Sequence, residues 1–316
     1  PATLPLASTS TTNPSEVYIY IGKKQSTGAE IEKAGLTNGK LYGVMVFRGN
    51  ALVTGESDLY GFGDATTGFI GSARFELVEV GINGDVSTWD GIQLENDSIS
   101  KHIFRFQRPE DGAWDPRGDS NDGLYFVTTG AIAGSPSTAV NRNSRLWRLK
   151  FKDLDHPTKG GKIEILRSGV ELTPPGWRMF DNICIDNHGR LLLQEDTGNN
   201  PWVARIWLYS IDNDELFEVA HHDPQLFDPT ISSPDFITQD EESSGIIDAE
   251  AILGRGWFLF DVQNHKANSD PELVEGGQLL ALFVPPAIGA SKAHQNKDHD
   301  DKDDKDKKEG HGKEHH

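Results

Sequence analysis

A repeat of short strand-like runs constrains the fold of this chain more than any other feature. In the clearest copy, residues 180–186 form a run rich in β-forming residues, 187–189 (Asn-His-Gly) form a turn, and 190–196 form a second run. Related copies begin near residues 108 and 244. A unit of two such runs cannot bury its own apolar face, so repetition of this kind predicts a stack of similar supersecondary units.

Further strand-like runs follow each pair. Third runs are found at 144–150, 204–209 and 277–282, and fourth runs at 162–166 and 215–219. Four antiparallel strands per unit are typical of a β-propeller blade, and a spacing of ~70 residues places the extra length in loop insertions. The sequence therefore predicts an all-β chain with a β-propeller architecture.

An earlier unit is less complete, with expected second, third and fourth strands near residues 16–21, 40–46 and 74–80. We thus expect about three and a half four-stranded blades, which is fewer than a closed ring needs, so the chain is expected to be part of a larger ring. The expected division is an incomplete first blade with an insertion over 1–100, three blades over 101–290, and a disordered tail rich in His, Asp and Lys over 291–316.

Charge and composition exclude some classes of protein. The formal net charge of −19 repels nucleic acid, and no run approaches the ~18 apolar residues of a membrane span. An acidic surface fits either recruitment of divalent cations or solubility as a secreted, periplasmic or cell-surface protein. The chain has one cysteine, Cys184, in an apolar run where a buried, inert thiol is expected.

Antiparallel blade geometry predicts where the acidic residues gather. Because the second strand of a blade returns beside the first, the start of strand one and the end of strand two lie at the same face. This face collects Glu110, Asp111, Asp181 and Asn182 from strand starts, and Thr128, Thr129, Glu195, Asp196, Gln263 and His265 from strand ends, with Lys23 and Lys24 from the incomplete blade.

Such a group of oxygen ligands suits calcium, which takes six to eight oxygens in flexible geometry. The candidate metal ligands are Glu110, Asp181, Glu195, Asp196 and His265. The alternative, in which solvated acids merely end the strands, remains open at this point.

Three of these segments resemble the PhoX-like family of bacterial calcium-dependent alkaline phosphatases. The motifs are 108–112 (Arg-Pro-Glu-Asp-Gly), 180–182 (Phe-Asp-Asn) with 189–196 (Gly-Arg-Leu-Leu-Leu-Gln-Glu-Asp), and 261–265 (Asp-Val-Gln-Asn-His). They occur in order at matching blade positions, and the resemblance extends over about residues 101–285, the carboxy-terminal part of such a protein.

The resemblance implies a propeller whose cluster of calcium and iron ions hydrolyses phosphomonoesters. By position, Arg108 would be the catalytic residue that holds the phosphate, and Glu110 and Asp181 would bind metal. An arginine offers a bidentate fork to phosphate, and clustered cations stabilise the transferring group. Lys23 and Asn182 are further candidates for substrate contacts. Several Ca²⁺ ions are expected, with Fe³⁺ only if a missing segment completes the cluster.

The sequence also departs from the family pattern. The family continues its last motif with Pro-Gly-Glu, whereas this chain has Asn264, His265 and Lys266, so that glutamate ligand has no match. The iron-binding cysteine of the family belongs to a region that has no counterpart here. The partner is then expected to be a small phosphorylated substrate or a missing amino-terminal half.

Two alternatives to a phosphomonoesterase remain. One is a non-catalytic, secreted calcium-binding propeller that presents an interaction surface. The other is a calcium propeller that acts on esters or lactones and would not need Arg108.

Overall fold

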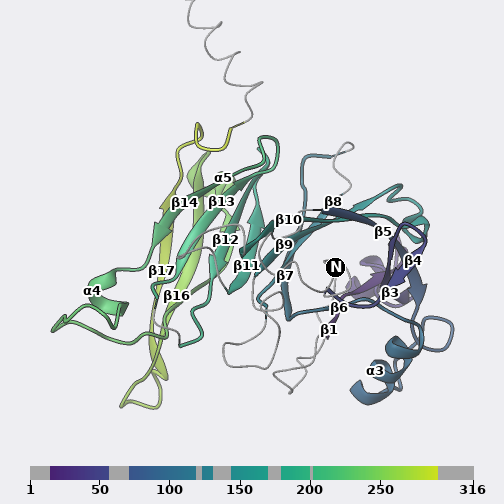
Figure 1. The fold of residues 1–316 in the computed structure, drawn as a ribbon, viewed down its shortest axis with the longest axis horizontal. Coiled ribbons are helices and arrows are strands. Elements are labelled where there is room, and N and C mark those ends of the chain that lie inside the picture. Colours follow the sequence, from purple (N-terminus) through teal and green to yellow (C-terminus); the bar gives the residue numbers. More distant parts are fainter. Residues whose placement is uncertain are drawn as a thin grey trace, which may run out of the picture.

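The structure is a computed structural model that describes residues 15–56, 71–118, 123–130, 144–169, 179–199 and 202–290. Antiparallel β-sheets dominate it (Figure 1). The strands are β1 (Ser15–Glu16), β2 (Tyr18–Ile21), β3 (Lys40–Arg48), β4 (Ala51–Val53), β5 (Gly71–Glu79), β6 (Arg105–Phe106), β7 (Pro109–Trp114), β8 (Gly123–Thr128), β9 (Arg145–Phe151), β10 (Gly161–Ser168), β11 (Phe180–Ile185), β12 (Arg190–Glu195), β13 (Arg205–Ser210), β14 (Glu215–His221), β15 (Glu242–Asp248), β16 (Trp257–Ala267) and β17 (Glu275–Phe283).

Short helices lie in the connections between strands. They are α1 (Glu30–Lys33), α3 (Gly91–Ser100), the 3₁₀ turn η2 (Pro157–Lys159), α4 (Pro224–Phe227) and α5 (Glu250–Leu253). Among the described helices, none is long and apolar enough to cross a membrane.

Three successive groups of strands follow the expected blade pattern. We call them blade 2 (β7 to β10), blade 3 (β11 to β14) and blade 4 (β15 to β17), each with its strands adjacent in chain order. Blade 4 has three strands among the described residues. Blade 1 consists of β2, β3 and β5, with β4 paired to β3. The prediction of an all-β, propeller-type fold is confirmed.

The first two blades are joined in a way that the repeat did not predict. The outermost strands β5 and β10 pair with each other, from Gly161 opposite Phe75 to Ile165 opposite Gly71. This pairing fuses blades 1 and 2 into one eight-stranded sheet that curls around a shared core, on the right of Figure 1. The short pair β1 and β6 lies beside it, and the strand expected over 16–21 is thereby divided after Glu16.

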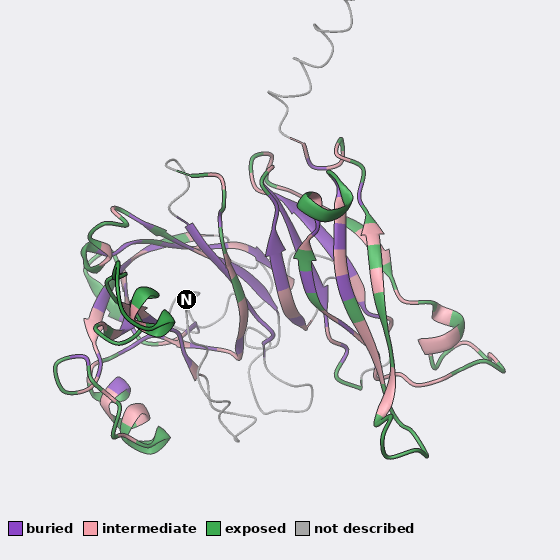
Figure 2. Cartoon of the chain, turned by 180° about the vertical axis from the view of Figure 1, so that it is seen from behind, coloured by how far each residue is buried: buried purple, intermediate pink, exposed green. Residues whose placement is uncertain are grey.

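Each interface between blades is apolar. Between blades 2 and 3, Tyr125 and Val127 pack with Ile183 and Leu193. On the other face of blade 3, Leu192 and Leu208 pack with Phe258 and Phe260 of blade 4, together with Cys184, whose predicted burial is confirmed. The middle strands of blade 3, β12 and β13, are buried on both faces, as strands between two neighbouring blades must be, whereas the outer parts of blade 4 are more exposed (Figure 2).

The core of the curled sheet depends on Phe75, which is fully buried on β5 and meets the ring of Phe151 edge-on with a centroid distance of 5.1 Å. We predict that Phe75→Ala lowers the free energy of unfolding by about 3–5 kcal/mol, because it leaves a cavity where β5 meets β10. Leu52→Ala, at a residue that is 38% exposed, should cost less than about 1 kcal/mol. Urea unfolding of both variants measures the difference, and equal small losses would contradict the fused sheet.

Candidate functional site

Four carboxylates converge where the first strands of blades 2, 3 and 4 begin. Glu110 is the second residue of β7, Asp181 the second of β11 and Glu242 the first of β15, while Asp196 follows directly after β12. Asp196 also forms a backbone bridge with Glu242, which joins blade 3 to blade 4. We call Glu110, Asp181, Asp196 and Glu242 the acidic cluster.

The charges of the acidic cluster raise the pKa of neighbouring carboxylates within it. Burial, together with the charges of Glu110, Glu242 and Asp196, raises the pKa of Asp181 to about 7, while Arg108 opposes them. The pKa of Glu110 is raised for the same main reason, and so is that of Glu242. Carboxylates that are both desolvated and crowded hold protons above the usual pH unless a cation neutralises them.

Hydrogen bonds from blade 2 hold the start of β11 in place. The Thr129 hydroxyl lies 3.0 Å from the carbonyl oxygen of Phe180 and 3.2 Å from the Glu110 carboxylate. The backbone N–H of Phe180 donates to the Ser144 hydroxyl at 2.9 Å. These contacts fix Glu110 and Asp181 relative to each other, because they tie the end of β8 to the start of the next blade.

The residue after each inner carboxylate makes a bond to the following blade. Asp111 accepts from the backbone N–H of Ile183 at 3.2 Å, and Asn182 accepts from the backbone N–H of Gly245 at 3.2 Å. The Asn182 amide nitrogen also donates to the Asp181 carboxylate. The predicted substrate contact Asn182 therefore lies beside the acidic cluster, with its side chain engaged in bonds within the protein.

Arg108 stands at the edge of the acidic cluster in a strained conformation. Its backbone has a positive φ of 55°, which costs free energy for any residue other than glycine. Met179, at the same place before β11, has φ 52°. The Arg108 guanidinium lies 3.9 Å from the Glu110 carboxylate (Nη2 to Oε1), and its Nη1 is buried without a hydrogen-bond partner among the described residues. The Arg108 side chain as a whole is 32% exposed, so the guanidinium can offer donors to an anionic oxygen.

His265 lies between two carboxylates at the opposite side of the acidic cluster. Its Nε2 is 3.1 Å from Glu242 and its Nδ1 is 3.3 Å from Glu275. Both carboxylates accept, so both ring nitrogens must carry protons to satisfy this geometry, and the pKa of His265 is raised accordingly although its partial burial acts in the other direction. Gln263 donates a further bond to Glu242 at 3.1 Å.

Two predicted site residues are placed differently. Glu195 is buried and accepts bonds from the Trp207 indole at 2.8 Å and the Arg205 backbone at 3.2 Å, so its carboxylate is directed into blade 3. Lys23 is exposed on the loop after β2, where its backbone exchanges hydrogen bonds with the Asn38 side chain. The structure does not bring these two into the acidic cluster.

Glu242 is the site residue that the sequence analysis missed. It lies just before the run that was recognised as the first strand of blade 4, and a bulge between Ser244 and Ile247 shifts the register of that strand. The consecutive carboxylates of 240–242 (Asp-Glu-Glu) were the available clue.

The acidic cluster supplies hard oxygen donors of the kind that calcium prefers. Within the described ranges, however, no three His, Cys, Asp or Glu side chains are grouped closely enough to hold a metal ion. The donor set thus fits a divalent cation in its chemistry, with further oxygens needed to complete the coordination.

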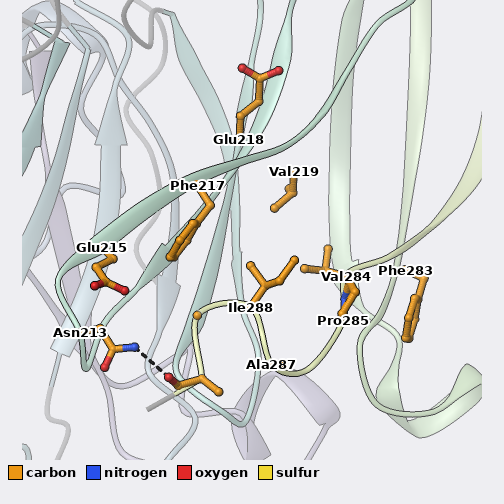
Figure 3. Close-up of a pocket in the computed structure, with 12 residues that line it drawn as sticks. Asn213, Glu215, Phe217, Glu218, Val219, Phe283, Val284, Pro285, Ala287 and Ile288 are labelled. Atoms are coloured by element: carbon orange, nitrogen blue, oxygen red, sulfur yellow. Dashed lines mark hydrogen bonds between the residues drawn. The ribbon is translucent and has the colours of Figure 1, made fainter. Parts of the chain in front are cut away.

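A separate cavity of about 460 Å³ lies at the other end of the blades. It is bounded by the turn between β13 and β14, including Asn213, and by the segment after β17, including Pro285 and Ile288 (Figure 3). The Asn213 amide donates to the Ala290 carbonyl at 2.8 Å across this end. The cavity is remote from the acidic cluster, because the cluster lies where β13 begins and β14 ends.

The crowding of the acidic cluster predicts how stability depends on pH in chelator-treated protein. The folded pKa of Asp181, about 7, exceeds the unfolded value of about 4. The contribution of protonated Asp181 to the free energy of unfolding is fully present below about pH 4 and is lost as the pH rises through 7. At pH 8, Asp181→Asn should therefore increase the free energy of unfolding by at least ~1 kcal/mol, the equivalent of about one pKa unit. Urea unfolding at several pH values is the measurement, and the exposed Asp261→Asn should change nothing.

Comparison with known proteins supports the architecture. No protein-family model and no curated protein sequence matches the chain. Among solved structures, PhoX of Pseudomonas fluorescens, determined in complex with vanadate, a transition-state analogue, superposes with a TM-score of 0.56 at 14% sequence identity. The match covers 88% of this chain and 51% of PhoX, so the chain spans about half the length of that protein. At this identity the likeness establishes a PhoX-like, propeller-type fold.

Proposed function

We propose that the acidic cluster and Arg108 form the calcium and phosphate site of a PhoX-like phosphomonoesterase. The observation that carries this proposal is the buried, unpartnered Nη1 of Arg108 beside four crowded carboxylates. An isolated acidic cluster would suit a cation alone. The added guanidinium suits an anion that bridges the cation and the protein, which is the arrangement a phosphate monoester needs.

In this proposal, carboxylates of the acidic cluster such as Glu110 and Asp181 would supply some of the oxygens that hold calcium, with further oxygens needed to complete the coordination. Calcium when bound would supply positive charge that stabilises the phosphoryl group during transfer to water. Arg108 binds and orients the phosphate oxygens from the side. The Thr129 hydroxyl contacts the Glu110 carboxylate, which lies 3.9 Å from the guanidinium. These contacts hold Arg108 and Glu110 in place relative to each other. Hydrolysis consumes one water and releases the alcohol and inorganic phosphate.

The strained backbone of Arg108 supports a functional role. Positive φ at a non-glycine residue persists only where the surrounding structure imposes it, and such strain concentrates at functional sites. Here the carbonyl of Arg108 accepts from the Thr129 backbone at 3.0 Å, which holds the strained conformation. The guanidinium is thereby positioned before any ligand arrives.

A second candidate function is a calcium-binding propeller without catalysis. The bonds of His265 to Glu242 and Glu275 favour it, since this histidine already neutralises part of the acidic cluster where the family has Pro-Gly-Glu. The two functions differ in whether Arg108 has a role in turnover.

The test combines metal content, measured by mass spectrometry, with hydrolysis of p-nitrophenyl phosphate. We expect bound calcium and chelator-sensitive turnover in the unmodified chain. Arg108→Ala should reduce kcat/KM by about 100-fold or more while calcium remains bound, as expected for loss of one group that stabilises the transition state. Glu110→Gln should reduce both calcium and turnover.

Arg255→Ala, at an exposed residue, serves as the matched control and should leave both quantities unchanged. Calcium without turnover would support the non-catalytic propeller. Turnover that survives Arg108→Ala would overturn the assignment of the phosphate site, and the absence of bound metal would overturn the calcium site.

A further inference from the structure

An apolar pocket of about 490 Å³ lies between blades 3 and 4, outside the acidic cluster. Its apolar walls are formed by Leu226, Phe227, Ile237, Phe260, Val262 and Leu280. This volume and lining are typical of binding sites for small organic ligands. Such sites are lined mainly by apolar side chains, with a few polar groups.

The pocket opens at the same end of the blades as the acidic cluster. It is bounded by Ile206 at the start of β13, by His221 and His222 at and just after the end of β14, and by Gln263 in the second half of β16. In antiparallel blades, these are the strand ends that share a face with the start of β11 and the end of β12. The pocket and the cluster therefore lie side by side on one face.

Gln263 connects the two sites directly. It contributes to the pocket wall, and its amide donates to the Glu242 carboxylate of the acidic cluster at 3.1 Å. Asn264, next along the wall, accepts from the Gly276 backbone at 3.1 Å. Gln263 and Asn264 thus place amide groups at the part of the pocket that adjoins the acidic cluster, where the polar end of a ligand would lie.

The outer wall comes from the excursion between β14 and β15. Its two limbs are joined by a backbone bond from Ile237 to Leu226 at 2.7 Å, which places both side chains on the pocket. The ring of Phe227 meets the imidazole of His222 edge-on, with a centroid distance of 5.4 Å. The wall is therefore a folded structure and not a loose loop.

The ionisable groups around the pocket are engaged within the protein, and the Asp223 carboxylate disfavours an anionic group here. The Asp223 carboxylate accepts from the backbone of Gln225 at 2.8 Å at the start of α4, and the His221 ring is bonded to Glu218 at 3.0 Å. Burial lowers the pKa of His222 to about 4, so this ring is neutral at physiological pH. An uncharged apolar group suits these walls, whereas a sugar or nucleotide would leave polar groups unsatisfied.

We propose that this pocket binds the aliphatic alcohol portion of the substrate, so that the preferred substrates are uncharged aliphatic monoesters of phosphate. Only the part of this assignment that concerns the phosphate group rests on the proposed function. Binding of the aliphatic group depends on the pocket alone and can be tested without catalysis.

The first experiment is calorimetric titration of the full chain with 1-butanol, 1-hexanol and 1-octanol. We expect each additional pair of methylenes to tighten binding about tenfold, from ~0.8 kcal/mol per buried CH₂. Ile237→Trp fills the pocket and should weaken octanol binding at least tenfold. Phe236→Trp, at the neighbouring residue that is 37% exposed and outside the lining, is the matched control and should bind like the unmodified chain.

A third variant provides a test that does not depend on the folding of Ile237→Trp. Ile237→Ala enlarges the pocket and should favour longer alcohols over butanol, with circular dichroism confirming the fold of each variant. Binding that is independent of chain length, or equal effects of the two tryptophan variants, would overturn the pocket assignment.

The second experiment measures kcat/KM for butyl, hexyl and octyl phosphate and for glucose 6-phosphate. We expect octyl phosphate to be preferred and Ile237→Trp to remove the dependence on chain length. Arg108→Ala should reduce turnover about 100-fold or more yet bind octanol normally. Length-dependent alcohol binding without any turnover would overturn the phosphatase and leave the apolar site supported, while turnover that is equal for all four esters would overturn the substrate preference.

Discussion

The convergence of three first strands is the constraint on which the rest of this structure depends. Adjacent residues of a strand point to opposite sides, so the residue next to each inner carboxylate faces the neighbouring blade. Asp111 uses that position to bond Ile183 of blade 3, and Asn182 uses it to bond Gly245 of blade 4. The bonds that hold the blades together therefore also fix Glu110 and Asp181 within the acidic cluster.

Without a bound ligand, this arrangement lowers the stability of the folded protein. Carboxylates that raise one another's pKa, a positive φ at Arg108 and a buried guanidinium nitrogen without a partner all reduce stability, and they occur together. Structural requirements do not account for the combination, since the apolar interfaces between blades are satisfied without it. Local violations of good packing and charge pairing that coincide in space are characteristic of functional sites. A cation with a bound oxyanion would relieve the crowding of the carboxylates and provide a partner for the guanidinium.

The sequence predicted the blades and three of the four residues of the acidic cluster because both follow from local pattern. Glu110 and Asp181 occupy equivalent positions in recognisable repeats. Glu195 was included with Asp196, although neighbours on a strand face opposite ways, and its carboxylate accepts a hydrogen bond from the buried indole N–H of Trp207. Glu242 was missed because a bulge separates it from the regular part of β15. The β5 to β10 pairing joins strands far apart in the chain, so no local pattern could reveal it.

The unusual length of the repeat has a structural explanation in the placement of its loops. Away from the acidic cluster, strands are joined by tight turns, such as those between β11 and β12 and between β13 and β14. On the face of the acidic cluster, the connections from β8 to β9 and from β14 to β15 are much longer. Blade packing depends on strands and not on these connections, so their length can change without loss of the core. The extra residues thus accumulate where they can build walls around a ligand, and the excursion that carries Leu226 and Ile237 is the described example.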